Sequence, residues 1–286
     1  MKKVLSAILM TLIWVPISHA IAGSLFSLNE QSFPTLLKLF DEHGAEALYG
    51  SGFYFADLTN IYLVTARHVL YSETAPYHLL EQKGSVSAFP VEEDKDSYTF
   101  DLDFLTLSNA GCMFVSSNHD IAAIHMWYQV SSTQIHLQPG VSGLTGTNMT
   151  MMALGGDAVG GYTNVTVGQD TYVFGYPVSL GIREAPKIDY NRPLLRKGIV
   201  AQKNAAARTI IIDAPAYGGN SGGPVFVVEK DSPLAVRMRI VGVVTEFIPY
   251  YDIWRSQRLK IDHVEVYNSG YSVVEPMETV RELLHH

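Results

Sequence analysis

The sequence predicts an all-β fold made of two β-rich halves, followed by one helix at the C-terminal end. Three observations lead to this prediction. The composition, with 23 Gly, 13 Pro and 16 Tyr in 286 residues, is typical of short strands joined by tight turns. Runs of β-branched and apolar residues lie on both sides of a glycine-rich stretch, and the last residues repeat apolar side chains at helical spacing. With 47% hydrophobic residues, the chain can bury a large core.

Residues 1–22 have the layout of a secretory signal peptide. Lys2 and Lys3 precede an apolar stretch over residues 4–17, and the run Ala20-Ile21-Ala22 offers a small-residue cleavage site. The alternative is an uncleaved N-terminal anchor, but the apolar stretch is short for a membrane-spanning helix. We therefore expect a periplasmic or secreted protein, with no stable membrane insertion after cleavage.

Charge and cysteine content narrow the function further. The formal net charge of −8 becomes −10 after removal of a leader that carries two lysines and no acidic residue. An acidic surface does not displace the counterions of nucleic acid, so we expect no nucleic-acid partner. Cys112 is the only cysteine, which excludes an intrachain disulfide. The core alone must then hold the exported protein together.

The first β-rich half is predicted to span residues 23–138. Strands are expected at residues 53–55 and 61–65, because both runs are apolar, rich in β-branched or aromatic residues, and flanked by turn residues. Residues 91–103, with the sequence VEEDKDSYTFDLD, read as a solvated acidic loop. The alternative for this stretch is a calcium site, although the spacing of an EF-hand is absent.

The second half is predicted to span residues 165–286, after a glycine-rich linker over residues 139–164. This linker contains seven glycines. Strands are expected at residues 171–175, 197–201, 209–212, 224–228 and 240–245. An amphipathic helix should follow Pro276, because Met277, Val280 and Leu284 fall on one helical face. We expect this helix to lie on the second group of strands.

The segment Gly218-Gly219-Asn220-Ser221-Gly222-Gly223-Pro224 is the strongest candidate for catalytic chemistry. A nucleophilic serine must be exposed on a tight turn, with backbone N–H groups converging beside it. Glycines allow the backbone angles that direct two amides to one point, here those of Gly219 and Ser221. The alternative is a glycine-rich hairpin without catalytic function.

A serine hydroxyl needs a neighbouring base, and His68 is the candidate. It follows the apolar strand predicted at residues 61–65. Asp120 leads directly into the apolar run Ile121-Ala122-Ala123, and orienting an imidazole would satisfy a carboxylate at such a position. The alternatives are a structural histidine at a strand end and an ordinary strand-capping aspartate.

Together these segments resemble the trypsin-like serine peptidases of the chymotrypsin fold, most closely the bacterial Deg-type branch, here without a PDZ domain. The matching segments are Gly50-Ser51-Gly52-Phe53, Val64-Thr65-Ala66 with His68, Asp120-Ile121-Ala122 and Gly219-Asn220-Ser221-Gly222-Gly223-Pro224. They follow one another in the order His, Asp, Ser, which differs from the order in subtilisins and α/β-hydrolases.

The resemblance implies two six-stranded β-barrels, with a catalytic triad in the cleft between them. His68 would be the general base and then the general acid, Asp120 would orient it, and Ser221 would attack the carbonyl carbon. The amides of Gly219 and Ser221 would form the oxyanion hole. Asn220 departs from digestive trypsins, which carry an aspartate there to pair with a new N-terminal ammonium group. Activation by that route is therefore not expected.

The resemblance also suggests which residues select the substrate. Val243, Val244 and Thr245 would line one wall of the pocket beside the serine. Pro215 occupies the position of the aspartate by which trypsins bind Lys or Arg. Such a pocket favours small or medium aliphatic side chains, while Asp213 or Glu246 could instead supply an acid for basic substrates.

The predicted function is that of an exported serine endopeptidase acting on proteins or peptides. The alternative is a catalytically silent protein of the same fold that serves in binding or adhesion. No histidine spacing in the chain matches a metal motif, so we expect neither a metal nor another cofactor. The sequence leaves the oligomeric state open.

Overall fold

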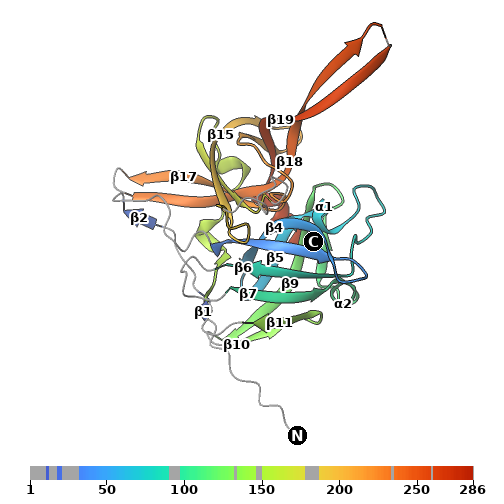
Figure 1. The fold of residues 1–286 in the computed structure, drawn as a ribbon. Coiled ribbons are helices and arrows are strands. Elements are labelled where there is room, and N and C mark those ends of the chain that lie inside the picture. The colour runs from blue at the N-terminus through green and yellow to red at the C-terminus, as the bar shows by residue number, and fades with distance from the viewer. Residues whose placement is uncertain are drawn as a thin grey trace.

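The computed structural model describes residues 11–12, 18–20, 32–89, 97–131, 134–145, 150–177, 187–232, 235–258 and 260–285. Most of the predicted signal peptide therefore lies outside the described residues. Within the described part of the chain, no helix is long and apolar enough to span a membrane. The fold is mostly β, as predicted, with two large sheets and a short C-terminal helix (Figure 1).

The first sheet is assembled around β5 (Asn60–Ala66), whose apolar side chains are buried almost throughout. Its main path has the order β10-β9-β5-β4-β3-β6-β7-β11, with β13 beside β4 and β8 beside β9. The other strands of this sheet are β3 (Pro34–Phe40), β4 (Glu46–Asp57), β6 (Lys83–Ala88), β7 (Tyr98–Asp103), β8 (Met113–Val115), β9 (Ile121–Ser131), β10 (Gln134–Leu137), β11 (Val141–Thr145) and β13 (Ala153–Leu154). Two short helices accompany the sheet, α1 (Arg67–Leu70) and α2 (Phe104–Asn109).

The expectation of a loop over residues 91–103 is wrong for its second half. Tyr98, Phe100 and Leu102 are buried in β7, and the residues between them face outward. This alternation places one apolar face in the core, so Asp101 and Asp103 on the opposite face do not prevent a strand. Residues 91–96 lie outside the described part of the chain.

The second sheet closes on itself. Its strands follow the order β17-β14-β15-β16-β19-β18, and a further pairing of β17 with β18 completes a ring of six. These strands are β14 (Asp170–Gly175), β15 (Leu194–Asn204), β16 (Thr209–Asp213), β17 (Pro224–Ser232), β18 (Ala235–Ser256) and β19 (Ile261–Pro276). The short strand β2 (Ser18–Ala20) pairs with β18 outside the ring. The ring agrees with the predicted six-stranded barrel.

The segment predicted as a linker, residues 139–164, contains strands of its own. β11 pairs with β7 and β13 pairs with β4, so the first sheet extends beyond residue 138. The remaining elements here are β12 (Thr150–Met151), which pairs with β1 (Thr11–Leu12), and the 3-10 helices η2 (Gly156–Ala158) and η3 (Tyr162–Asn164). The glycine content indicated a linker. In the structure, however, the backbone groups of β7 and of the end of β4 form hydrogen bonds with this segment as the chain leaves the sheet.

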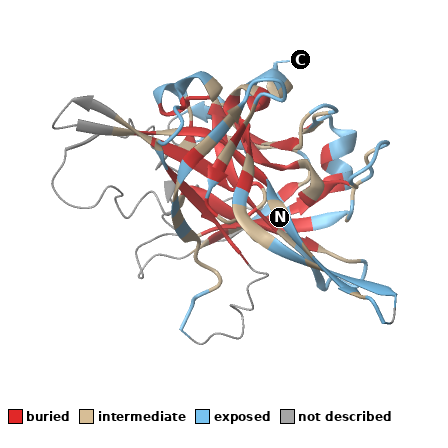
Figure 2. Cartoon of the chain, turned by 90° about the horizontal axis from the view of Figure 1, so that it is seen from above, coloured by how far each residue is buried: buried red, intermediate tan, exposed pale blue. Residues whose placement is uncertain are grey.

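A hydrophobic cluster joins the two sheets and the helix α3 (Met277–Leu284). Phe53 and Val64 contribute from the first sheet, and Phe174 and Phe226 contribute from the second. Met277 of α3 is fully buried in the same cluster. The helix was expected on the second group of strands alone, but its apolar side chains contact residues of both sheets. Figure 2 shows the continuous buried interior from which this cluster is formed.

Candidate active site

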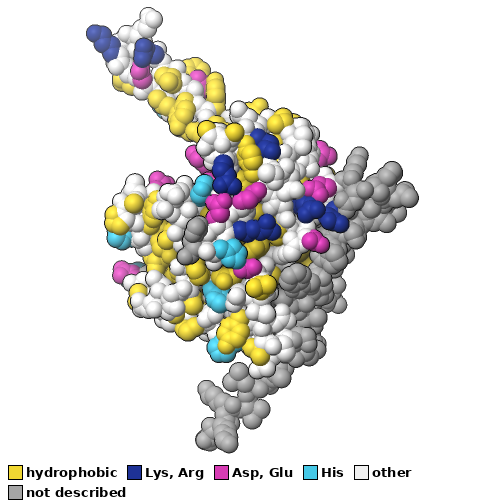
Figure 3. Space-filling view, turned by 180° about the vertical axis from the view of Figure 1, so that it is seen from behind, with side chains coloured by type: hydrophobic (Ala, Val, Ile, Leu, Met, Phe, Trp, Pro, Cys, Tyr) yellow, Lys and Arg dark blue, Asp and Glu magenta, His cyan; other side chains and the backbone are white. Residues whose placement is uncertain are grey.

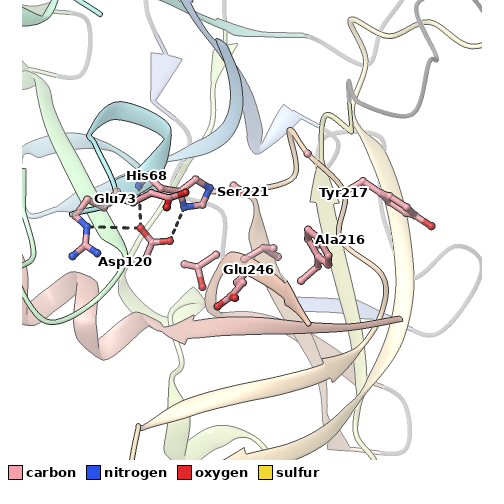
Figure 4. Close-up of a pocket in the computed structure, with 12 residues that line it drawn as sticks. His68, Glu73, Asp120, Ala216, Tyr217, Ser221 and Glu246 are labelled. Carbon is pink, nitrogen blue, oxygen red and sulfur yellow. Dashed lines mark hydrogen bonds and ion pairs between the residues drawn. The ribbon is translucent and has the colours of Figure 1, made fainter. Parts of the chain in front are cut away.

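The three residues predicted as a triad line one pocket of about 510 Å³. His68 lies in α1, Asp120 precedes β9, and Ser221 precedes β17, so two residues come from the first sheet and one from the second. Figure 4 shows His68, Asp120 and Ser221 around this pocket, with Glu246, Ala216 and Tyr217 on its other side.

His68 and Asp120 are held together by two hydrogen bonds. Nδ1 of His68 lies 2.6 Å from Oδ2 of Asp120, and the backbone N–H of His68 donates to Oδ1 at 3.0 Å. With Nδ1 donating to the carboxylate, the other ring nitrogen, Nε2, can act as the proton acceptor. The Ser221 hydroxyl makes no hydrogen bond among the described residues. Catalytic hydrogen bonds in ligand-free sites often form only when substrate is bound.

Arg67 fixes the turn that carries Asp120. Its guanidinium group donates to the carbonyl oxygens of Ser116 and His119 at 2.8 and 2.9 Å. Its backbone N–H donates to the carbonyl of Asp120, and the guanidinium lies over the ring of Tyr77, 4.1 Å from the centroid. The sequence reasoning assigned no function to Arg67. Its position directly before His68 was the only available signal.

A buried acid lies behind the triad. Glu275, which is only 7% exposed, lies 3.0 Å from Nδ1 of His119. Burial raises the pKa of Glu275 above its ordinary value. The facing His119 lowers it, and the nearby charge of Asp120 raises it further. Because Glu275 lies just before α3, this pair connects the C-terminal helix to the turn that carries Asp120.

The loop around Ser221 presents two amides without acceptors. The N–H groups of Gly219 and Ser221 donate to no acceptor among the described residues. The carbonyl of Asn220 accepts from the N–H of Gly223 at 2.9 Å. The Ser221 N–H of the same peptide unit therefore points in the opposite direction. Gly219 has φ of +98°, a left-handed conformation that favours glycine.

Gly222 allows this loop to lie against the first sheet. Its φ is +89°, and a Cβ there would lie 2.0 Å from the carbonyl oxygen of Ser51. Asn220 closes the loop upon itself, because its side-chain oxygen accepts from the N–H of Tyr217 at 3.1 Å. The position at which digestive trypsins carry an aspartate thus holds an amide with a local structural partner.

Ser51 is a second residue that the sequence reasoning left without a function. It is fully buried in β4 and forms three hydrogen bonds that connect the two sheets at the loop of Ser221, with a fourth inside the first sheet. Its N–H donates to the carbonyl of Ser221 at 2.8 Å, and its hydroxyl donates to the carbonyl of Gly219 at 2.6 Å. The hydroxyl also accepts from the N–H of Tyr176, and the Ser51 carbonyl accepts from Thr65. Ser51 therefore holds the carbonyl groups of both residues with free amides.

The predicted substrate-binding residues lie in two different environments. Val244 and Thr245 line the pocket, whereas Pro215 and Val243 do not. Val243 is fully buried in the cluster between the sheets, and the regular pairing of β18 is interrupted just beyond it.

The segment before the Ser221 loop is held by Ser272, which places Ala216 in the pocket. The Ser272 hydroxyl donates to the carbonyl of Ala214 at 2.7 Å and accepts from the N–H of Ala216 at 2.9 Å. Ala216, rather than Pro215, lines the cavity. The other lining residues include Tyr217, Gly218, Glu73, Glu246 and Phe247.

No group of side chains able to hold a metal ion occurs among the described residues. The charged groups of the pocket are the carboxylates of Glu73, Asp120 and Glu246 with the guanidinium of Arg67. The arrangement can therefore supply a hydroxyl, an imidazole oriented by a carboxylate, and two amides, which are the groups needed for acyl transfer.

Comparison with known proteins agrees with this chemistry. Residues 50–232 match the model of the trypsin-like peptidase domain. A protease from Arthrobacter nicotinovorans has 14% identity to this chain over 86% of this chain and 90% of its own, with a TM-score of 0.45. A serine endoprotease from Yersinia pestis has 16% identity over 89% of this chain, with a TM-score of 0.44, and this chain spans 62% of its length. Among curated proteins, no relative of the chain was found.

The matched residues cover well over half of the chain and include His68, Asp120 and Ser221. The chain therefore belongs to the trypsin-like peptidase domain family and is a serine endopeptidase.

Proposed function

We propose that the protein is an exported serine endopeptidase in which His68, Asp120 and Ser221 form the catalytic triad. The observation that carries this proposal is the pairing of His68 with Asp120 at 2.6 Å in the pocket that Ser221 also lines. An imidazole held in this way presents Nε2 to the pocket as a proton acceptor. A role limited to binding would not require this tautomer.

In the proposed reaction, Oγ of Ser221 attacks the carbonyl carbon of the scissile bond while Nε2 of His68 takes the hydroxyl proton. The negative charge that forms on the carbonyl oxygen is stabilised by the N–H groups of Gly219 and Ser221. One such donor contributes about 3–4 kcal/mol to transition-state stabilisation in related chemistry. His68 then passes its proton to the leaving amine, which breaks the C–N bond and leaves an acyl-enzyme. Water, activated by His68, hydrolyses the ester and restores Ser221.

Asp120 makes no contact with the substrate in this mechanism. Its carboxylate accepts the Nδ1–H of His68 and stabilises the positive charge that the imidazole acquires. Arg67 supports Asp120, because it binds the carbonyl groups of the turn that ends at Asp120 and its Nε lies 4.0 Å from Oδ1 of Asp120.

The proposed cleavage site follows a small or medium aliphatic residue. Ala216, Val244 and Thr245 supply a short and mostly apolar lining, which suits a side chain of this size. In a library of peptides, we expect Ala and Val to be enriched at the position before the cleaved bond. Enrichment of Lys or Arg instead would contradict this preference and would assign the selecting charge to Glu246, the acidic residue on the opposite side of the pocket.

Export to the periplasm or the exterior belongs to the same proposal. It is supported by the charge and apolar patterning of residues 1–22, ending in Ala20-Ile21-Ala22.

The decisive experiment is labelling of the folded protein with a fluorophosphonate, which reacts with serines that have been activated as nucleophiles. Wild type is expected to take up one equivalent of label and to cleave peptides. Ser221→Ala is expected to do neither while keeping the same melting temperature, because only the attacking oxygen is removed. A folded wild-type protein that takes up no label would contradict the proposal and favour a catalytically silent binding protein.

A further inference from the structure

Residues 246–269 of β18 and β19 form a two-stranded hairpin that extends away from the second barrel, and we call this segment the arm (Figure 1). Eight apolar side chains of the arm are between 49% and 62% exposed. They are Tyr250, Tyr251, Ile253, Trp254, Ile261, Val264, Val266 and Tyr267. Figure 3 shows hydrophobic side chains along the arm. Exposed apolar surface at this density is typical of a binding site.

One side of the arm carries a continuous apolar group. Tyr251 is paired with Val266, and Ile253 with Val264, so these four side chains lie on the same face of the hairpin. None of them belongs to a hydrophobic core cluster of the protein. A hairpin alone buries too little surface to account for such residues.

On the face of Tyr251 and Ile253, the charged side chains next to the apolar group pair with each other. Arg255 forms two hydrogen bonds of 2.9 Å with Asp262 at the tip. Glu265 accepts from Tyr267 and lies 3.3 Å from His263. The face of Tyr251, Ile253, Val264 and Val266 therefore offers a partner mainly apolar side chains, which favours an apolar polypeptide over a charged ligand.

β18 connects the arm directly to the candidate active site. Val244 and Thr245 line the pocket, and Glu246 and Phe247 line its outer part where the arm begins. β17 pairs with β18 only as far as Val243, and beyond that residue the structure pairs β18 with β19 alone among the described strands. Among the described residues, one edge of β18 thus has no partner strand from Thr245 to Arg255, a distance of about 33 Å at strand spacing.

We propose that the arm binds the polypeptide substrate, as an extended apolar segment on the N-terminal side of the scissile bond. This inference rests on the proposed function. The pocket wall on β18 receives the side chain of the residue whose carbonyl is attacked, so the preceding residues continue along β18. There they add a strand to its free edge, where their apolar side chains lie next to Tyr251 and Ile253 and extend the apolar face that these residues form with Val264 and Val266. The substrate class is a protein with an exposed, extended apolar segment about ten residues long before the cleavage site.

The test compares three fluorescence-quenched peptides that share one cleavable core. The first is the core alone, the second carries ten Val, Ile and Tyr residues before the core, and the third carries ten Gly and Ser residues there. For the full-length protein, we expect kcat/KM to be about tenfold higher for the apolar extension than for the other two, mainly through a lower KM.

Two double variants assign the effect to the apolar face. Ile253→Ser with Val264→Ser should abolish the tenfold advantage and leave cleavage of the core unchanged. Asp252→Ser with Glu265→Ser is the matched control, because this neighbouring cross-strand pair lies on the other face. It should keep the advantage. Unchanged cleavage of the core also shows that both variants are folded.

The outcomes separate this inference from the proposed function. If wild type cleaves no peptide and takes up no fluorophosphonate, the proposed function fails. If wild type cleaves the core and both extensions at equal kcat/KM, only the role of the arm is overturned. Two other results would also overturn it, provided that the Ile253→Ser, Val264→Ser variant cleaves all three peptides as wild type does. In the first, wild type is an oligomer and this double variant is a monomer, which would show that the arm binds a second copy of the protein. In the second, wild type binds phosphatidylglycerol vesicles and this double variant does not, which would show that the arm binds lipid.

Discussion

Replacing Asp120 by asparagine is expected to lower kcat for peptide cleavage by about four orders of magnitude. The carboxylate of Asp120 accepts from Nδ1 of His68 at 2.6 Å and from the His68 backbone at 3.0 Å. An asparagine that keeps the backbone contact would turn its NH₂ group toward Nδ1. The imidazole would then carry its proton on Nε2 and could not accept the proton of Ser221.

Glu73→Gln is the matched control for this prediction. Glu73 lines the same pocket, and the structure shows no hydrogen bond from its carboxylate to His68. Its replacement removes the same charge and is expected to change kcat by less than about threefold, as is usual for exposed charges. Both variants should be measured for kcat and for melting temperature. Retention of more than a tenth of the wild-type kcat by a folded Asp120→Asn variant would exclude Asp120 as the residue that orients His68.

Replacing Ser51 by alanine is expected to lower kcat by about a hundredfold, which is the effect of losing one oxyanion donor. The Ser51 hydroxyl donates to the carbonyl of Gly219 at 2.6 Å and accepts from the N–H of Tyr176 at 2.9 Å. Without it, the carbonyl of Gly219 has no fixed partner, and a glycine at φ +98° can change conformation easily. The Gly219 amide would then lose its direction. Ser51 is thus a positioning residue.

The effect of Ser51→Ala should appear in kcat and leave KM nearly unchanged, because an oxyanion hole acts on the transition state. The two buried groups left without partners should also lower the stability, by about 1–3 kcal/mol each. Ser87→Ala is the matched control, because Ser87 is a buried serine that bonds to Thr99 within the first sheet. It should lower stability without affecting kcat. Partial recovery of kcat in Ser51→Cys would support positioning, and equal kcat values for Ser51→Ala and wild type would refute it.

The strands with continuous apolar runs were predictable from local sequence. The run at residues 61–65 lies in β5, and the runs at 171–175 and 209–212 lie in β14 and β16. Strands that depend on their partners were not predicted. β7 carries acidic residues on its outer face, and only its pairing with β6 and β11 identifies Tyr98, Phe100 and Leu102 as core residues.

The arm was not predicted from the sequence, for a related reason. Many of its residues are β-branched or aromatic, which is typical of a strand, but such a composition normally indicates burial on one face. The sequence cannot show that this hairpin extends beyond the barrel, since that depends on where the partner strands end. β17 pairs with β18 only as far as Val243, and the arm begins three residues later.

Some residues around the candidate site were also predictable from local sequence, and others were not. Local sequence pointed to Ser221 through its glycines, and to His68 and Asp120 through their places at the ends of apolar strands. The resemblance to trypsin-like peptidases placed Pro215 and Val243 in the substrate pocket, but the hydrogen bonds of Ser272 place Ala216 there instead, and Val243 lies in the core. Local sequence did not indicate Arg67 and Ser51, because their contacts with the candidate site are made by residues distant in the chain, 49 positions apart for Arg67 and Ser116 and 168 for Ser51 and Gly219.

Sequence alone therefore predicted the family, the all-β class and the three residues of the candidate triad, because each depends on residue types within short segments. The tertiary structure alone decided that His68 and Asp120 are bonded at 2.6 Å, that Ser51 holds the loop of Ser221, and that an apolar arm leads away from the pocket. These features arise from contacts between distant segments. Such contacts depend on strand order, register and burial, which short-range patterns do not encode.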